Sequence, residues 1–281
     1  MKRFSCASSV CLQVVAMATL CGCGPSKPPP STGLTADVDA ACGGPAWRGR
    51  RALSADITVS RQARPDLHGQ MLYEIPGNRL VLQFPVQGGG LASCGLDSQS
   101  MWLDCPFDIN YAGWPHVLQW ANWVAVPYRL TDTSIRAREV QPVSVAGESY
   151  RTVEIERPAD GPGVCVLYVT PGALRPRGAV PECPARVHCD SVPGAYAFAY
   201  LSYDLCDDVV VPTRWSVWTW DAQSGVSAAG PVASISLQNL RFVDPDPSLF
   251  DVPAGEAIRR IPRAQTPTDE THVAEASHGT R

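Results

Sequence analysis

Short turns divide most of this 281-residue chain into strand-like segments, and this spacing constrains the fold more than any other feature. Residues 76–78 (PGN), 146–148 (AGE) and 207–208 (DD) each separate two runs rich in β-branched and aromatic residues. Strands joined by turns this short pair antiparallel. The sequence therefore predicts about nine to eleven strands, most of them antiparallel to their neighbours in the chain.

One segment breaks the strand pattern and predicts a helix. It runs from Pro115, at the position expected for the first helical residue, and stops before Pro127. The segment is apolar on nearly every side, so the helix is either buried in the core or lines an apolar cavity. A shorter helix is expected at residues 36–42, where Gly43 ends it.

Residues 209–221 (VVVPTRWSVWTWD) form the most distinctive strand because they carry tryptophan on both faces. Trp215 lies on one face, and Trp218 and Trp220 share the other, since side chains alternate along a strand. A sheet with one face in water alternates more cleanly. We therefore expect one face of this strand to be covered and the other to meet an apolar space, although simple burial by a helix and a loop is the alternative.

The N-terminus has the features of a secretory signal peptide. Lys2 and Arg3 precede an uncharged, largely apolar run that ends at residues 20–23 (LCGC). A membrane span is disfavoured because serine, glutamine and threonine interrupt this run, and a span needs ~20 predominantly apolar residues. The end of the run resembles the bacterial lipobox, with Leu20 three positions before Cys23. This resemblance implies cleavage before Cys23 and lipidation of that cysteine.

These features predict four parts of the chain. Residues 1–22 are expected to be a lipoprotein signal peptide, 23–34 a lipidated cysteine with a proline-rich tether, 35–253 one β domain, and 254–281 a disordered tail. Gly24 follows the lipidated cysteine; in bacteria that retain lipoproteins at the inner membrane through aspartate at that position, glycine implies export to the outer membrane. We expect the domain to face the periplasm or the cell surface.

Seven cysteines follow Cys23, and disulfides are the default expectation for an exported chain. Because seven is odd, at least one of them stays unpaired, and Cys42 is the expected one. The expected pairs are Cys94 with Cys105 across a hairpin, Cys183 with Cys189 around a short loop, and Cys165 with Cys206 if their strands are neighbours. A metal site within residues 182–189 (ECPARVHC) is disfavoured because the segment lacks the tight cysteine pairs of zinc sites.

The order of these segments resembles the LolA-like superfamily, which includes lipoprotein carriers and proteins similar to outer-membrane lipoprotein-sorting proteins. The resemblance covers residues 35–253, and its most specific part is the acidic-turn hairpin YLSYDLCDDVVVPTRWSVWTWD. It implies an α+β fold in which a curved antiparallel sheet, a half-open β-barrel, has helices covering its concave face. In the carriers this concave face is apolar and holds acyl chains. The cysteines, the tryptophans and the loop 171–193 depart from the carriers.

Several functional classes lack support in the sequence. We find no nucleophile elbow, H-E-x-x-H, P-loop or dinucleotide fingerprint, so we expect no enzyme and no cofactor. His68, His116 and His188 lie in unrelated contexts and are expected at the surface or in loops. The formal net charge is −4 and no basic stripe is present, so nucleic acid is not an expected partner.

The favoured hypothesis is a membrane-anchored lipoprotein of the cell envelope whose apolar cavity binds acyl chains or another amphiphile without catalysis. The alternative is a structural or interaction lipoprotein whose concave face is simply core, and an exported hydrolase is a more distant third. The expected cavity-lining residues are Leu118, Trp120, Trp123, Val124, Trp218 and Trp220, which would act by shape and apolar burial.

Overall fold

The computed structural model describes residues 33–86, 89–97, 100–105, 113–133, 135–145, 147–156, 164–169, 183–189, 196–221, 223–254 and 258–262. They belong to a single compact unit, Ser31–Arg281. The expected signal peptide, Cys23 and most of the expected tether lie outside the described residues. None of the described helices is both long and apolar enough to cross a membrane.

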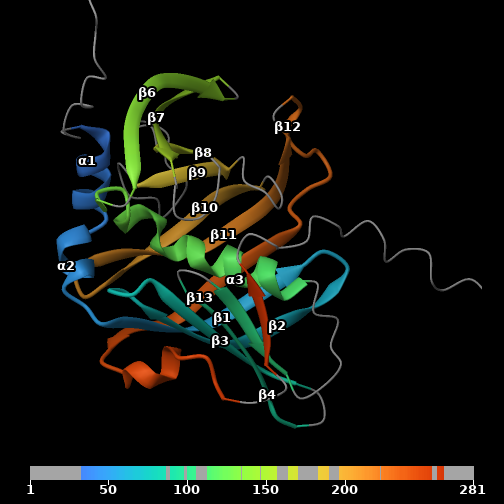
Figure 1. Ribbon diagram of the computed structural model, residues 1–281. Helices are drawn as coiled ribbons and strands as arrows, with labels where there is room; N and C mark the ends of the chain where they lie inside the picture. Colours follow the sequence, from blue (N-terminus) through green and yellow to red (C-terminus); the bar gives the residue numbers. More distant parts are fainter. Residues whose placement is uncertain are drawn as a thin grey trace, which may run out of the picture. The chain divides into compact units, whose positions relative to one another are not determined.

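Strands dominate the fold (Figure 1). Their bounds are β1 Ala52–Arg61, β2 Arg64–Glu74, β3 Arg79–Pro85, β4 Leu91–Leu96, β5 Ser100–Asp104, β6 Arg136–Val145, β7 Glu148–Glu156, β8 Val164–Val169, β9 Pro184–Cys189, β10 Tyr196–Cys206, β11 Val209–Asp221, β12 Gly225–Val226, β13 Ala233–Val243 and β14 Arg259–Pro262. They pair in the order β14-β5-β4-β3-β2-β1-β13-β11-β10-β9-β8-β7-β6, with β12 beside β11. Strands β14 and β6 end this order, so the sheet of the described residues is not closed.

The predicted antiparallel sheet is confirmed. Hairpins join most neighbours, as at residues 207–208, where both aspartates have positive φ values, 44° and 65°. Two successive positive φ values are typical of the tight turns that match the twist of a hairpin. The register next to this turn pairs Cys206 with Val209. The acidic turn is therefore a structural element of the hairpin between β10 and β11.

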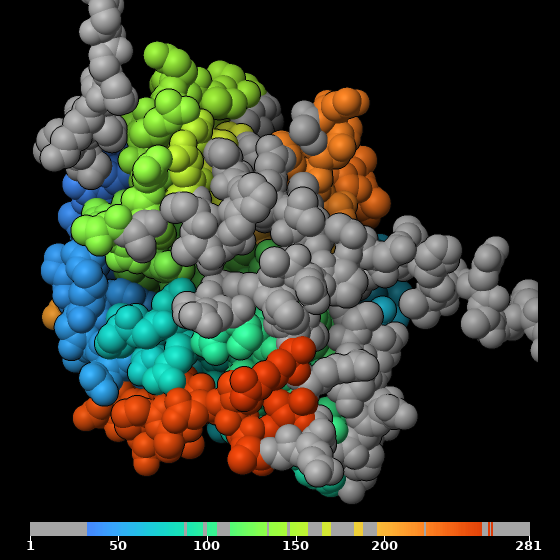
Figure 2. Space-filling view, in the orientation of Figure 1, coloured from blue at the N-terminus to red at the C-terminus, as the bar shows by residue number. Residues whose placement is uncertain are grey.

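The helices are α1 Leu34–Ala41, α2 Gly44–Arg48, α3 Trp114–Asn122, and the short 3₁₀ helices η2 Trp123–Tyr128 and η3 Pro247–Phe250. Helix α3 and η2 together form the apolar helix predicted between Pro115 and Pro127, and they cross one face of the sheet (Figure 1). We call this the helix face and the other side of the sheet the opposite face. Figure 2 shows α1 in blue beside β6 and β7 in green. The α+β class is thus confirmed.

One part of the main core lies between α3, η2 and strands β10 and β11. The ring of Phe198 stacks on Trp123 with 4.1 Å between centroids. The Tyr200 hydroxyl donates to the backbone carbonyl of Trp123 at 2.9 Å, and the indole Nε1 of Trp215 donates to the carbonyl of Trp120 at 3.1 Å. These bonds add side-chain donors to carbonyls near the end of α3, where few backbone N–H groups remain to pair with them. Aromatic side chains of the sheet therefore fix the position of the helix.

The structure describes only a short part of the segment expected to be a disordered tail. Residues 259–262 form β14, in which Ile261 pairs with Met101 of β5. The prediction of disorder is therefore wrong for these residues. A strand of four residues is too short to show a period in the sequence, and the strand that it pairs with lies far away in the chain. Residues 263–281 lie outside the described part.

Gly43 connects α1 to α2 and provides a test of the packing there. Its φ is +77°, and an added Cβ would lie 2.3 Å from the backbone oxygen of Asp208. We expect Gly43→Ala to lower the free energy of unfolding by about 2–4 kcal/mol, because left-handed backbone costs a side chain ~1–2 kcal/mol and the clash adds overpacking strain. Urea denaturation measures this loss.

Gly147→Ala is the matched control for Gly43→Ala. Gly147 has a similar φ of +84°, but nothing lies within 4 Å of an added Cβ. Only the conformational cost applies at this site, about 1–2 kcal/mol. Equal losses at the two glycines would show that contact with the β10–β11 turn does not constrain Gly43.

Candidate functional site

Four of the six expected cavity-lining residues are packed into the helix-face core. Leu118, Trp120, Trp123 and Val124 are each at most 6% exposed. The two tryptophans meet aromatic rings of β10, which fill the space beneath the helix. These four residues act as core residues in this structure.

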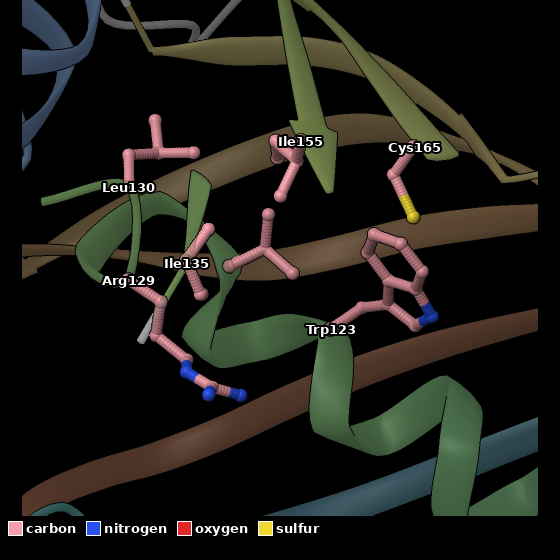
Figure 3. Close-up of a pocket in the computed structure, with 7 residues that line it drawn as sticks. Trp123, Arg129, Leu130, Ile135, Ile155 and Cys165 are labelled. Carbon is pink, nitrogen blue, oxygen red and sulfur yellow. The ribbon is translucent and has the colours of Figure 1, made fainter. Parts of the chain in front are cut away.

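The space beneath η2 is too small for a ligand. A pocket of about 10 Å³ lies among Trp123, Leu130, Ile135, Ile155 and Cys165. Figure 3 shows the Trp123 ring close to the Cys165 sulfur, with the Arg129 guanidinium pointing away from this cluster. A cavity needs about 10–15 Å³ to hold a single water molecule. Beneath η2, among the described residues, the expected open cavity is therefore not formed, because large side chains fill the space.

The other two expected lining residues, Trp218 and Trp220, lie on the opposite face and line a much larger pocket. Its volume is about 440 Å³. Tyr168 and the two tryptophans contribute large side chains, and Val226 of β12, which is 50% exposed, lies at its edge. The volume falls within the usual range for small-molecule sites, about 300–1,000 Å³. The structure thus separates the six expected residues onto two faces of the sheet.

Small residues in β10 create this hollow. Ala197 pairs with Trp218, and Ala199 lies between Ser216 of β11 and Arg186 of β9 in the register. An alanine beside large neighbours leaves space above the sheet. The Nε1 of Trp218 donates to the Ser216 hydroxyl at 2.9 Å, so the polar atom of this indole is already satisfied. The indole can therefore offer apolar surface to a ligand.

Arg186 is the charged residue among those that line this pocket. Its guanidinium lies 5.8 Å from the centre of the Tyr150 ring. Burial raises the pKa of the Tyr168 hydroxyl, and the positive charge of Arg186 partly opposes that rise. The pocket is therefore an apolar hollow with a cation at its side.

A further pocket of about 200 Å³ lies near the start of α3. Arg61 and Arg64 line it together with Gly113, Trp120 and Tyr196. The Nε1 of Trp120 is buried there and has no hydrogen-bond acceptor among the residues that the structure describes. Polar groups provide most of this lining, so the pocket is poorly suited to an acyl chain.

The expected disulfide between Cys165 and Cys206 is wrong. Cys165 is disulfide-bonded, whereas Cys206 is a free thiol that donates to the carbonyl of Leu240 at 3.7 Å. The expected pair fails because β9 lies between β8 and β10. In the register of β8 and β9, the residue opposite Cys165 is Cys189.

The bridge expected between Cys94 and Cys105 is also not formed. Both are buried free thiols. Cys94 is opposite Leu103 in the register of β4 and β5, so it is offset by two residues from Cys105. Burial raises the pKa of the Cys94 thiol, which therefore stays protonated. Cys183 lies against Cys42, with 3.0 Å between the sulfurs, rather than closing a small loop with Cys189.

The expected surface position of His116 is wrong. This residue lies on α3 and is 4% exposed. Its Nδ1 is 3.2 Å from the Tyr196 hydroxyl, and its ring stacks on Trp120. His68 lies in β2, where its Nδ1 is 3.1 Å from the Thr58 hydroxyl. No group of three histidine, cysteine or acidic residues that could hold a metal occurs in the described part of the chain.

Sequence reasoning missed Tyr168, Arg186 and the alanines of β10. The segment YAFAYL alternates large and small residues, so Ala197 and Ala199 could have been placed on one face. The sequence does not show that this face lies next to Tyr168 and Arg186, because those two residues belong to other strands. Only the order of the strands in the sheet shows that these residues line one pocket.

No protein-family model matches the chain, and no curated protein matches it in sequence. Among solved structures, a LolA superfamily protein from Nitrosomonas europaea matches with a TM-score of 0.49 at 13% identity, over 78% of this chain and 97% of that one. A DUF1329 family protein from Desulfovibrio piger matches with a TM-score of 0.49 at 12% identity, over 78% and 97%.

A Vibrio parahaemolyticus domain described as an outer-membrane lipoprotein-sorting protein matches with a TM-score of 0.48 at 12% identity, over 78% of this chain and 94% of that one. These likenesses concern the fold alone.

Proposed function

We propose that this protein is a lipid-anchored protein of the cell envelope that binds an acyl chain or a similar amphiphile and catalyses no reaction. The observation that supports this proposal is the pocket of about 440 Å³ on the opposite face, lined by Trp218 and Trp220. Burying apolar surface there contributes ~25 cal/mol per Å² to binding, less the cost of ordering the ligand. Binding would therefore rest on shape and apolar contact.

The ligand class is narrowed by Arg186. An exposed guanidinium beside an apolar hollow favours an amphiphile with an anionic group, such as a carboxylate or phosphate. The apolar chain would lie over Ala197 and Ala199, and the charged end would point toward Arg186. A fatty acid is the simplest molecule with both features.

A structural or interaction role is the second candidate. The observation that favours it is the packing of the helix face, where only about 10 Å³ remains beneath Trp123. On this alternative, the helix face is core and the hollow on the opposite face has no ligand. The two candidates therefore differ in whether the purified protein takes up an amphiphile.

Ala199→Trp tests the proposed function. Ala199 lines the hollow, and a tryptophan there would fill it. We expect the variant to bind a fluorescent long-chain fatty acid at least tenfold more weakly than the wild type, equivalent to a loss of ~1.4 kcal/mol or more. Fluorescence titration measures the affinity, and native mass spectrometry detects lipid that co-purifies.

Leu205→Trp is the matched control, since Leu205 lies on the same strand, is 72% exposed and does not line the pocket. We expect it to leave the affinity unchanged. Equal binding by wild type and Ala199→Trp would place the ligand elsewhere. No uptake of fatty acid and no co-purifying lipid in the wild type would favour the structural role.

A further inference from the structure

Two cysteines that lie far apart in the sequence meet in the core. The Sγ atoms of Cys42 and Cys183 are 3.0 Å apart, although 141 positions separate the residues. Both side chains are fully buried. The separation is short for two sulfur atoms that are not bonded to each other.

The backbone holds Cys42 in this position independently of the sulfur contact. Its carbonyl accepts a hydrogen bond from the Val210 N–H at 3.0 Å, at the start of β11. Gly43, the next residue, packs directly on the Asp208 carbonyl. The end of α1 is therefore fixed against the β10–β11 hairpin.

Cys183 is held in a similar way. It directly precedes β9, and the neighbouring Pro184 carbonyl accepts a hydrogen bond from the hydroxyl of Tyr203, which is buried in β10. The two cysteines are thus brought together by contacts that each element makes with the β10–β11 hairpin. A bond between the sulfurs would require only a small further approach, since a disulfide has S–S of about 2.05 Å.

The thiols are poorly suited to chemistry in the folded protein. The contact with Cys183 and burial raise the pKa of the Cys42 thiol far above its ordinary range. The thiolate is the form that attacks disulfides and binds metals, so a buried neutral thiol is unreactive. Oxidation of this pair would therefore take place before the core closes during folding.

We propose that Cys42 and Cys183 form a disulfide bond in the exported protein. The two thiols together give up two protons and two electrons, and a new S–S bond forms between their sulfurs. The acceptor is the disulfide of a thiol oxidase, which receives them by thiol–disulfide exchange and leaves as a dithiol. Cys165 keeps its own disulfide in this arrangement.

The bond would join two segments that are 141 positions apart in the sequence. Helix α1 is the first described element after the expected tether, and β9 lies in the half of the sheet that ends with β6. A cross-link that closes a loop of this length strongly restricts the unfolded chain. It would therefore keep the N-terminal helices on the sheet when force is applied through the tether. This inference is independent of the proposed ligand.

Peptide mapping of the exported wild-type protein tests the bond directly. The protein is denatured without reductant, its thiols are alkylated, and its proteolytic peptides are identified by mass spectrometry. We expect a peptide containing Cys42 linked to one containing Cys183, with the link lost after reduction. Alkylation of both cysteines, or a link from either one to a different cysteine, would overturn the proposal.

Alanine variants provide a second readout. Cys42→Ala and Cys183→Ala are each expected to lower the Tm by about 5–15 °C, and the double variant no further than the larger single loss, because both changes remove the same bond. Cys206→Ala is the control, since Cys206 is a half-buried free thiol, and its Tm should change by no more than about 3 °C. Additive losses from the two single variants would contradict the disulfide.

Discussion

Trp215→Ala is expected to lower the free energy of unfolding by about 3–5 kcal/mol. The side chain is 0% exposed and lies between the sheet and α3. Removing the side chain leaves a cavity. The Trp120 carbonyl also loses the hydrogen bond that it accepts from the indole Nε1 of Trp215 at 3.1 Å. Both effects act on the contact that positions the helix. Urea denaturation followed by circular dichroism measures the loss.

Trp220→Ala is the matched control, because this residue is on the same strand but lies half-buried on the opposite face. We expect a loss below about 1.5 kcal/mol there. Trp215→Phe refines the test: it keeps most of the apolar volume and removes only the indole donor, so its loss should lie between those of the two alanine variants. Equal losses from Trp215→Ala and Trp220→Ala would show that packing on the helix face contributes no more to the free energy of unfolding than packing on the opposite face.

The features that could be predicted from the sequence are those set by neighbouring residues. The turn at residues 207–208, the helix between Pro115 and Pro127, and the faces of Trp215 and Trp218 all follow from local backbone preferences and side-chain alternation. Each of these predictions agrees with the structure. Together they determine an antiparallel sheet with an apolar helix packed on it.

The features that could not be predicted depend on strand order and packing. Alternation assigned Trp215 and Trp218 to different faces, but it could not show which face the helix covers or how completely aromatic rings fill the space there. The pocket needs Tyr168 from β8 and Arg186 from β9 beside Ala199 of β10, which only the order of these strands provides. The pairing of Cys165 with Cys206 failed for the same reason, because β9 lies between their strands. The pairing of Cys94 with Cys105 failed because the register of their hairpin offsets the two residues.

Under the proposed function, the lipid anchor would hold the pocket within a limited distance of the membrane. The tether from Cys23 to Leu34, the first residue of α1, spans at most about 40 Å when fully extended. A domain held this close to a bilayer meets acyl chains at high local concentration, which favours an amphiphile as ligand. The anchor and the pocket are therefore two parts of one proposal, and each can be tested separately.

Cys23→Ser is expected to move nearly all of the protein from the membrane fraction to the soluble fraction, or to leave it as an uncleaved precursor. Each buried CH₂ of an acyl chain contributes ~0.8 kcal/mol, so losing all the chains removes the membrane affinity of the anchor. Cys21→Ser is the matched control, because Cys21 lies two positions earlier, within the part of the leader that is expected to be removed. Fractionation with mass spectrometry of the N-terminus measures both variants. Release by Cys21→Ser with retention of Cys23→Ser would assign lipidation to the other cysteine, whereas retention of both would mean that the chain is held at the membrane by something other than this anchor.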